Sequence, residues 1–271
     1  MFKLSGFGDE ISPDLNTQLE VMESVGIKNL EIRGVYGKGV LELNEEEIKR
    51  VKDTLQEKDF KVSAIGSPIG KIKITDDFSI DLERLQKAFS LAKILETEYI
   101  RIFSYYLPQE NEDPSTYSKE VIGRLREMTN LAEKENIILL CENEYDVYCD
   151  IPERCLEVLK SIDSPHLRLT FDPANFIMAD VKPYTEAFPQ LVNYIEYLHI
   201  KDARFSDKAI VPAGEGDGEI KEILKELKER DFDGFLSLEP HLATAGKAGG
   251  FSGAELFKKA ALALQKILEG T

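Results

Sequence analysis

Four residues with metal-binding side chains stand at or near the ends of short apolar segments in the second half of the chain. Three carboxylates that met at one point would repel one another unless a cation lay between them. Together with an imidazole, they form a ligand set that suits Mn²⁺, Mg²⁺, Co²⁺ or Zn²⁺. The four residues are Glu142 after IILLC, Asp172 after LRLTF, His199 near the end of YIEYLHI, and Glu239 after FLSL.

Each of these residues alone also has a purely structural interpretation. An acid directly after a strand often caps the next helix or pairs with a basic side chain. The occurrence of such residues in four successive segments nevertheless favours a shared site for one divalent metal ion. We therefore predict that all four are metal ligands.

The apolar segments belong to a pattern that runs along the whole chain. Eight short segments rich in apolar or β-branched residues begin roughly 25 to 40 residues apart, the length of one strand–helix unit. Most are almost continuously apolar, as expected for strands that are buried on both faces. The predicted strands span residues 3–7, 29–32, 61–65, 99–103, 137–141, 167–171, 194–200 and 235–238.

Helical signals fill the intervals between these strands. Apolar residues recur there with the spacing of an amphipathic helix, and the signal is weakest over 151–162 and 183–193. Asn44 followed by Glu47 predicts a capping box, and Ser12-Pro13-Asp14 predicts a helix start with Ser12 as the N-cap and Pro13 and Asp14 in the first turn.

Eight strand–helix units predict an α/β fold, a single closed (β/α)8 barrel over residues 1–271. Active sites of such barrels gather at the carboxyl ends of the strands, where the four predicted ligands stand. A doubly wound open sheet is the alternative. It would need a glycine-rich phosphate turn after the first strand, but GFGDE at 6–10 lacks the GxGxxG pattern.

Composition argues against several classes of protein. The chain has 271 residues with 34 basic and 50 acidic side chains, and its net charge of −16 disfavours nucleic acid and anionic membranes as partners. No apolar segment reaches the roughly 18 to 20 residues of a membrane span, and the start MFKLSGFGDE lacks the apolar core of a signal peptide. We therefore expect a cytoplasmic globular protein. Its three cysteines, without a CxxC pair, predict reduced thiols.

Longer strings add a family resemblance to this interpretation. LLCENE (139–144), TFDPANF (170–176), LHIKDA (198–203), PAGEGDGEI (212–220) and FLSLEPH (235–241) resemble the xylose isomerase-like TIM-barrel superfamily of sugar and sugar-phosphate isomerases and epimerases. The resemblance covers essentially the whole chain, and it implies a metal held by the same four residues. The endonuclease-IV-type members need more histidines than the three in this chain.

The resemblance also implies an activity. In ketose epimerases of this superfamily, two metal-bound glutamates transfer protons beside the carbonyl group, through an enediolate of the sugar. Those roles fall to Glu142 and Glu239, with a small carbohydrate or sugar phosphate as substrate. We favour Mn²⁺, because three oxygens and one nitrogen form a mostly hard site. Family members are often dimers or tetramers, so a homo-oligomer is consistent with the resemblance.

Three alternatives to an epimerase or isomerase stay open. The first is a metal-dependent lyase or dehydratase that acts on an inositol or keto-sugar derivative. The second is a sugar-binding barrel that has lost turnover, and the third is an endonuclease-IV-type enzyme.

Further residues near the predicted strand ends are candidates for substrate binding. For Arg101, an internal ion pair is an equal alternative to substrate binding. For His241, an exposed loop position is an equal alternative. Many family members carry a histidine where this chain has Asn175. The candidates are Arg101, Glu144, Asn175, Lys201 and His241.

Two more features have open interpretations. Glu31 and Arg33 share a face at the end of the second predicted strand, where they would bind substrate or each other. The glycine-rich segments 214–218 and 246–253 are candidates for a phosphate site.

Overall fold

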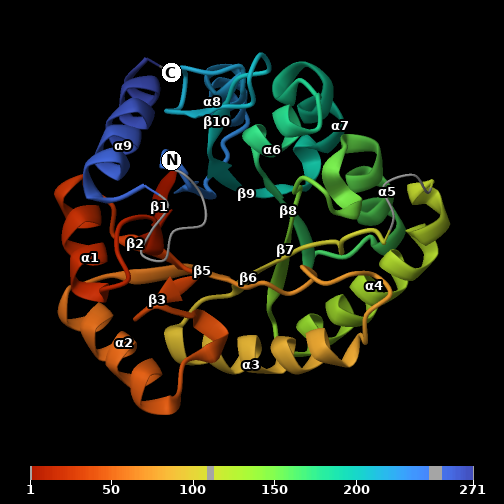
Figure 1. The fold of residues 1–271 in the computed structure, drawn as a ribbon, viewed down its shortest axis with the longest axis horizontal. Coiled ribbons are helices and arrows are strands. Elements are labelled where there is room, and N and C mark those ends of the chain that lie inside the picture. The colour runs from red at the N-terminus through yellow and green to blue at the C-terminus, as the bar shows by residue number, and fades with distance from the viewer. Residues whose placement is uncertain (1, 109–112, 244–251, 271) are drawn as a thin grey trace.

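Eight parallel strands close into a barrel in the computed structural model, which describes residues 2–108, 113–243 and 252–270 (Figure 1). The order around the ring is β1, β2, β5, β6, β7, β8, β9 and β12, and β12 pairs with β1 to complete it. The predicted (β/α)8 barrel is therefore confirmed, and the open sheet is wrong. The barrel strands are β1 (Lys3–Phe7), β2 (Asn29–Ile32), β5 (Lys61–Gly66), β6 (Tyr99–Ile102), β7 (Ile138–Glu142), β8 (Leu167–Phe171), β9 (Ile195–Ile200) and β12 (Phe235–Leu238).

Helices surround the barrel and cover its strands (Figure 1). The longer ones are α1 (Leu15–Ser24), α2 (Glu45–Glu57), α3 (Ser79–Leu95), α4 (Ser118–Lys134), α5 (Pro152–Ile162), α8 (Ile220–Glu229) and α9 (Ala254–Glu269). The shorter ones are α6 (Pro173–Met178), α7 (Phe188–Leu191), η1 (Gly8–Glu10), η2 (Val40–Glu42), η3 (Pro114–Tyr117), η4 (Tyr148–Asp150), the π-helical turn η5 (Pro183–Ala187) and η6 (Val192–Tyr194).

The helix start predicted at Asn44 has the expected contacts, whereas the N-cap of α1 is Asp14, two residues after the predicted Ser12. Asp14 Oδ1 accepts a hydrogen bond from the backbone N–H of Thr17 at 2.9 Å and caps α1. Asn44 Oδ1 accepts one from the N–H of Glu47 at 2.9 Å, and the Glu47 carboxylate accepts one from the N–H of Asn44 at 3.0 Å. These reciprocal bonds confirm the capping box at the start of α2.

One of the two weak helical segments is stronger than the sequence suggested. α5 is a regular helix, because Cys155, Val158 and Leu159 recur at helical spacing and are all buried. The segment 183–193 contains only the turn η5, the four-residue helix α7 and the start of η6, as its weak signal predicted.

Two short hairpins project from the carboxyl ends of strands and shape the rim of the barrel. β3 (Gly34–Val35) and β4 (Lys38–Gly39) follow β2, while β10 (Asp202–Ala203) and β11 (Ile210–Val211) follow β9. Both lie on the side where the predicted ligands stand.

The barrel interior is polar rather than purely aliphatic. Ser5 Oγ lies 2.6 Å from Ser63 Oγ, which lies 2.9 Å from the hydroxyl oxygen of Tyr197, and all three are buried. The main apolar core therefore lies between the strands and the surrounding helices. No helix in the described ranges is long and apolar enough to cross a bilayer.

Candidate functional site

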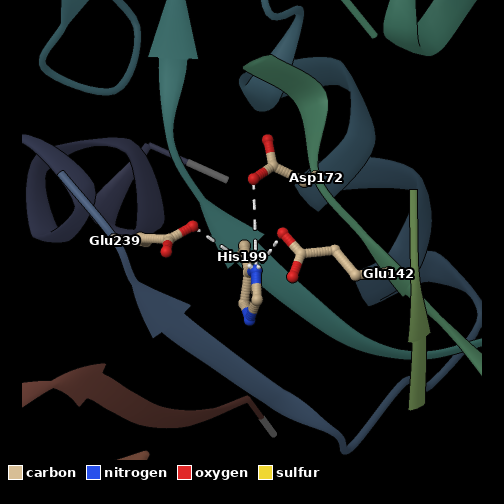
Figure 2. Close-up of side chains that lie close together, drawn as sticks. All are labelled: Glu142, Asp172, His199 and Glu239. Atoms are coloured by element: carbon tan, nitrogen blue, oxygen red, sulfur yellow. Dashed lines mark hydrogen bonds and ion pairs between the residues drawn. The ribbon is translucent and has the colours of Figure 1, made fainter. Parts of the chain in front are cut away.

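The four predicted ligands converge at the carboxyl ends of β7, β8, β9 and β12, which are neighbours in the barrel (Figure 2). Each offers one ligand atom, and these atoms lie within 4.8 Å of one another. All four side chains are buried. His199 Nδ1 lies at the centre of the group, 3.0 Å from Glu142 Oε1, 3.7 Å from Glu239 Oε2 and 4.0 Å from Asp172 Oδ2.

The two carboxylate oxygens of Asp172 have different surroundings. Oδ1 accepts a hydrogen bond from the backbone N–H of Asn175 at 3.0 Å and thereby caps α6. Oδ2 has no hydrogen-bond partner among the described residues, although Lys201 Nζ lies 2.7 Å from it. A helix cap and a ligand role are therefore compatible, because each uses a different oxygen.

The charge state of the cluster is the chemical reason to expect a cation. Burial raises the pKa of Asp172 to about 7, even though the nearby Lys201 ammonium attracts the ionised form. A buried carboxylate without enough positive charge is costly, and a divalent cation would lower that cost. Three carboxylates and one imidazole nitrogen therefore fit a divalent metal, in both their charge and their donor atoms.

Both oxygens of Glu142 are held by neighbouring side chains. Asn175 Nδ2 donates a hydrogen bond to Oε1 at 3.2 Å, and Arg101 Nη1 donates one to Oε2 at 3.1 Å. Burial opposes ionisation of Glu142, but the charges of His199 and Arg101 outweigh it and lower its pKa to about 2. Of the two alternatives for Arg101, the internal ion pair is the one observed, and its partner is a predicted ligand.

Glu239 is held in a similar way. Arg33 Nη1 lies 2.6 Å from Oε1, and Lys201 Nζ lies 3.0 Å from Oε2. The same ammonium thus contacts two predicted ligands, Asp172 and Glu239. Burial opposes ionisation of Glu239, but Lys201 above all keeps its pKa well below the usual range.

His241 belongs to a network on the rim behind Glu239. Its Nε2 atom lies 3.8 Å from Glu239 Oε1 and 3.1 Å from Glu10 Oε1. Glu10 also accepts a hydrogen bond from the hydroxyl of Ser252 at 2.7 Å. Burial raises the pKa of Glu10 to about 7 and lowers that of His241 to about 3, so this imidazole is neutral.

Glu31 has a role that the sequence did not predict. Its two carboxylate oxygens lie 3.3 and 3.2 Å from Nε2 of His199, and both side chains are completely buried. A carboxylate at this nitrogen fixes the orientation of the ring and leaves Nδ1 facing the other ligand atoms. The available signal was an acidic residue inside a buried strand, which requires a partner within the barrel.

Arg33 likewise has partners that the sequence did not identify. It contacts both oxygens of Asp9 at 2.8 and 3.0 Å, and Glu10 Oε1 at 3.1 Å, in addition to Glu239. This arginine therefore connects β2 with the segment after β1 and with the end of β12.

A cleft of about 640 Å³ opens beside the cluster. All five predicted substrate-binding residues line it: Arg101, Glu144, Asn175, Lys201 and His241. Glu144 also pairs with Lys71, another residue of the lining, at 2.6 Å. A second hollow of the same volume lies at the amino ends of the strands, near Lys61 and Tyr99, and none of the predicted ligands lines it.

The first glycine-rich segment does not fit a phosphate site. The backbone N–H groups of Gly214, Gly216 and Gly218 donate hydrogen bonds to the carboxylate of Asp202, at 2.8, 3.1 and 2.9 Å. An acidic side chain thus uses the amides that a phosphate would need. The prediction for 246–253 concerns residues of which 246–251 lie outside the described ranges.

A family model for the xylose isomerase-like TIM barrel matches residues 19–267. The chain belongs to this family. The 3-dehydroshikimate dehydratase of Bacillus anthracis is 25% identical to the chain over 232 residues, which make up 79% of this chain and 81% of that protein.

Solved structures show the same fold over nearly the whole chain. A D-tagatose 3-epimerase-like protein has a TM-score of 0.80 at 22% identity, covering 99% of this chain and 97% of its own. The IOLI protein, crystallised with a zinc atom, has a TM-score of 0.80 at 17% identity, covering 99% of both chains. Proteins similar to this chain thus include a 3-dehydroshikimate dehydratase and a D-tagatose 3-epimerase-like protein.

Proposed function

We propose that the protein is a divalent-metal-dependent epimerase or isomerase of a small sugar, in which Glu142 and Glu239 transfer protons beside the carbonyl group. The arrangement of these two carboxylates is the observation that carries the proposal. They come from β7 and β12, which β8 and β9 separate in the barrel, and they face each other across His199 (Figure 2). A substrate carbon between them would present one face to each carboxylate.

The surrounding side chains suit this role. A bound divalent cation would supply positive charge to the carbonyl and hydroxyl oxygens of the sugar. In a complex in which Glu142 is ionised and Glu239 is protonated, Glu142 would remove the proton next to the carbonyl and Glu239 would deliver its own proton to the opposite face, with an enediolate of the sugar between the two steps. Proton exchange of both carboxyl groups with water would then restore the starting state. Arg101 and Asn175 fix the oxygens of Glu142, while Arg33 and Lys201 fix those of Glu239.

We propose Mn²⁺ as the metal, because three of the four donors are hard carboxylate oxygens. The zinc atom bound in the structure of the IOLI protein, which has the same fold, supports a divalent ion as cofactor. Metal analysis after mild purification should find about one equivalent per chain, as a single four-ligand site requires. A protein that neither retains nor binds Mn²⁺, Mg²⁺, Co²⁺ or Zn²⁺ would contradict the proposal.

Replacement of each glutamate by glutamine tests the proton transfers. The amide of Glu142→Gln or Glu239→Gln cannot accept a proton at any metal concentration. We expect a loss of epimerisation of about 10²- to 10⁴-fold that saturating Mn²⁺ does not restore. Each variant should retain exchange of solvent deuterium with only one of the two epimers, and the two variants should differ in which one.

The measurement is deuterium uptake by NMR, in D₂O, with a panel of ketoses and both epimers of each reactive pair. Turnover near that of the unmodified protein at saturating metal would show that the replaced glutamate is a ligand only. Deuterium uptake by neither epimer with the unmodified protein, over the whole panel, would contradict the proposed reaction.

A dehydratase is the second candidate, and the relationship to the Bacillus anthracis enzyme favours it. Loss of water from the carbon next to an enolate needs the same first proton transfer, but it also needs a leaving group. The same incubation separates the two candidates, because a dehydratase gives a product whose mass is lower by one water molecule.

A further inference from the structure

We propose that the substrate carries an anionic group, a carboxylate or a phosphate, and that Arg84 and Lys87 of α3 bind it at one end of the cleft. The proposal deepens the proposed function and rests on it, since it takes the end that contains Glu239 as the reacting end. Both basic residues line the same cleft as Arg101, Asn175 and Lys201.

The charge of the cleft differs from that of the whole chain. Six basic and three acidic side chains line the cleft, whereas the chain has 34 basic and 50 acidic residues. Such a local excess of basic groups attracts anions to the cleft of an acidic protein. The six are Arg33, Lys71, Arg84, Lys87, Arg101 and Lys201.

Four of these six basic groups already contact carboxylates inside the cleft. Arg33, Arg101 and Lys201 contact the predicted metal ligands, and Lys71 contacts Glu144. Their positive charge is therefore largely balanced by the protein itself. Of the remaining two, Arg84 pairs only with Asp81 of its own helix and Lys87 contacts no carboxylate among the described residues, so both keep hydrogen-bond donors for a ligand.

Arg84 has one anchored edge and one open edge. Its Nη1 atom lies 3.1 Å from Oδ1 of Asp81, a completely buried carboxylate that also accepts a hydrogen bond from the backbone N–H of Gly70 at 2.9 Å. Its Nε and Nη2 atoms have no hydrogen-bond partner in the described ranges. A guanidinium held on one side offers the other side to an oxyanion with little further loss of side-chain entropy.

Lys87 extends the same basic surface by one helical turn. Residues three apart on a helix lie on the same face, so Lys87 is a neighbour of Arg84 on the side of α3 that lines the cleft. Its ammonium group has no ion pair or hydrogen bond with any residue that the structure describes. The two side chains together can enclose the oxygens of one anionic group.

The cleft thus joins the cluster of predicted metal ligands to a basic end on α3. A neutral ketose would use only the first of these. A sugar acid or a sugar phosphate would use both, with its hydroxyl and carbonyl oxygens near Glu239 and its anionic group near Arg84 and Lys87.

Binding of matched ligand pairs tests this inference. Isothermal titration of the Mg²⁺-loaded protein would compare D-fructose with D-fructose 6-phosphate, and D-glucose with D-glucuronate. We expect the anionic member of at least one pair to bind at least tenfold more tightly than the neutral member, and raised salt to reduce the difference. The pair that shows the preference distinguishes a phosphate from a carboxylate.

Variants of α3 locate the preference. The double variant Arg84→Gln/Lys87→Gln should reduce it to less than about twofold. The matched control is Lys93→Gln, because Lys93 lies on the same helix, is 59% exposed and pairs with Glu135 outside the cleft. It should leave the preference unchanged. Thermal unfolding of each variant checks that the fold is intact.

The inference is overturned if neither pair shows a preference for the anion, or if the preference survives in the double variant. Because the measurement is binding and not turnover, it is separate from the test of the proposed reaction. A protein that catalyses no deuterium exchange but binds the anion through Arg84 and Lys87 would refute the reaction alone.

Discussion

Replacement of Asp202 by asparagine should destabilise the protein by about 2 kcal/mol, although the two side chains have almost the same shape. Oδ1 of Asp202 accepts hydrogen bonds from the N–H groups of Ala203 and Gly218, at 2.8 and 2.9 Å. Oδ2 accepts them from Gly214 and Gly216, at 2.8 and 3.1 Å. The amide nitrogen of asparagine cannot accept, so two backbone donors lose their partner whichever way it is oriented.

The magnitude follows from the number of donors left without a partner. A buried donor that loses its acceptor costs about 1–3 kcal/mol, which gives about 2–6 kcal/mol if Ala203 and Gly218 are the pair that loses it. Gly214 is exposed and Gly216 is half-buried, so the asparagine nitrogen should turn towards that pair, where water replaces part of what is lost and the cost falls to about 2 kcal/mol. No residue with a side chain fits at Gly216 or Gly218, since a Cβ atom there would lie 2.4 or 2.6 Å from Oδ1 of Asp202. The loop and the carboxylate therefore depend on each other.

The assay is urea unfolding of metal-free protein at pH 8, because burial raises the pKa of Asp202 and an alkaline pH favours its ionised form. Asp207→Asn is the control, because Asp207 lies on the same hairpin segment, is 51% exposed and pairs with Arg204. It should change the free energy of unfolding by less than about 0.5 kcal/mol. A loss below about 1 kcal/mol for Asp202→Asn would refute the reasoning from its hydrogen bonds.

Two further predictions concern buried carboxylates. Glu31→Ala should weaken Mn²⁺ binding about 10- to 100-fold by isothermal titration, because Nε2 of His199 loses its partner, and an unchanged affinity would contradict this. Burial raises the pKa of Glu10 from 4.5 to about 7, so the stability linked to its proton is present below about pH 4.5 and lost as pH rises through 7. Relative to Glu10→Gln, the unmodified protein should lose about 3 kcal/mol of unfolding free energy between pH 4.5 and pH 8. Parallel pH profiles of the two proteins in urea would contradict it.

The sequence predicted the barrel strands with ends that differ by one residue at most from those observed. Continuous apolar segments define buried parallel strands well, because few other structures bury both faces of a short segment. The position of the ligands followed from the same pattern, since parallel strands end at one rim. The short elements were not predicted: α6 has six residues and the strands of the rim hairpins have two each, too few for a periodic signal.

Contacts between residues far apart in the chain could not be predicted from the sequence either. His199 and Glu31 are 168 residues apart, and His241 and Glu10 are 231 apart. Only closure of the ring brings such residues together. Glu31 had a local explanation in the sequence, a pair with Arg33, and Glu10 had no signal of its own, so nothing in their immediate surroundings indicated the distant partner of either.

The pairing of β12 with β1, the seam at which the barrel closes, determines when the predicted metal site can form during folding. β12, the last barrel strand along the chain, carries Glu239 and pairs with β1, the first. Arg33 joins the two sides of this seam through Asp9 and Glu239. A chain emerging from the ribosome would therefore have three ligands long before the fourth, and could form the complete site only after its ends had met. Metal occupancy would then distinguish a finished barrel from one that lacks its last strand.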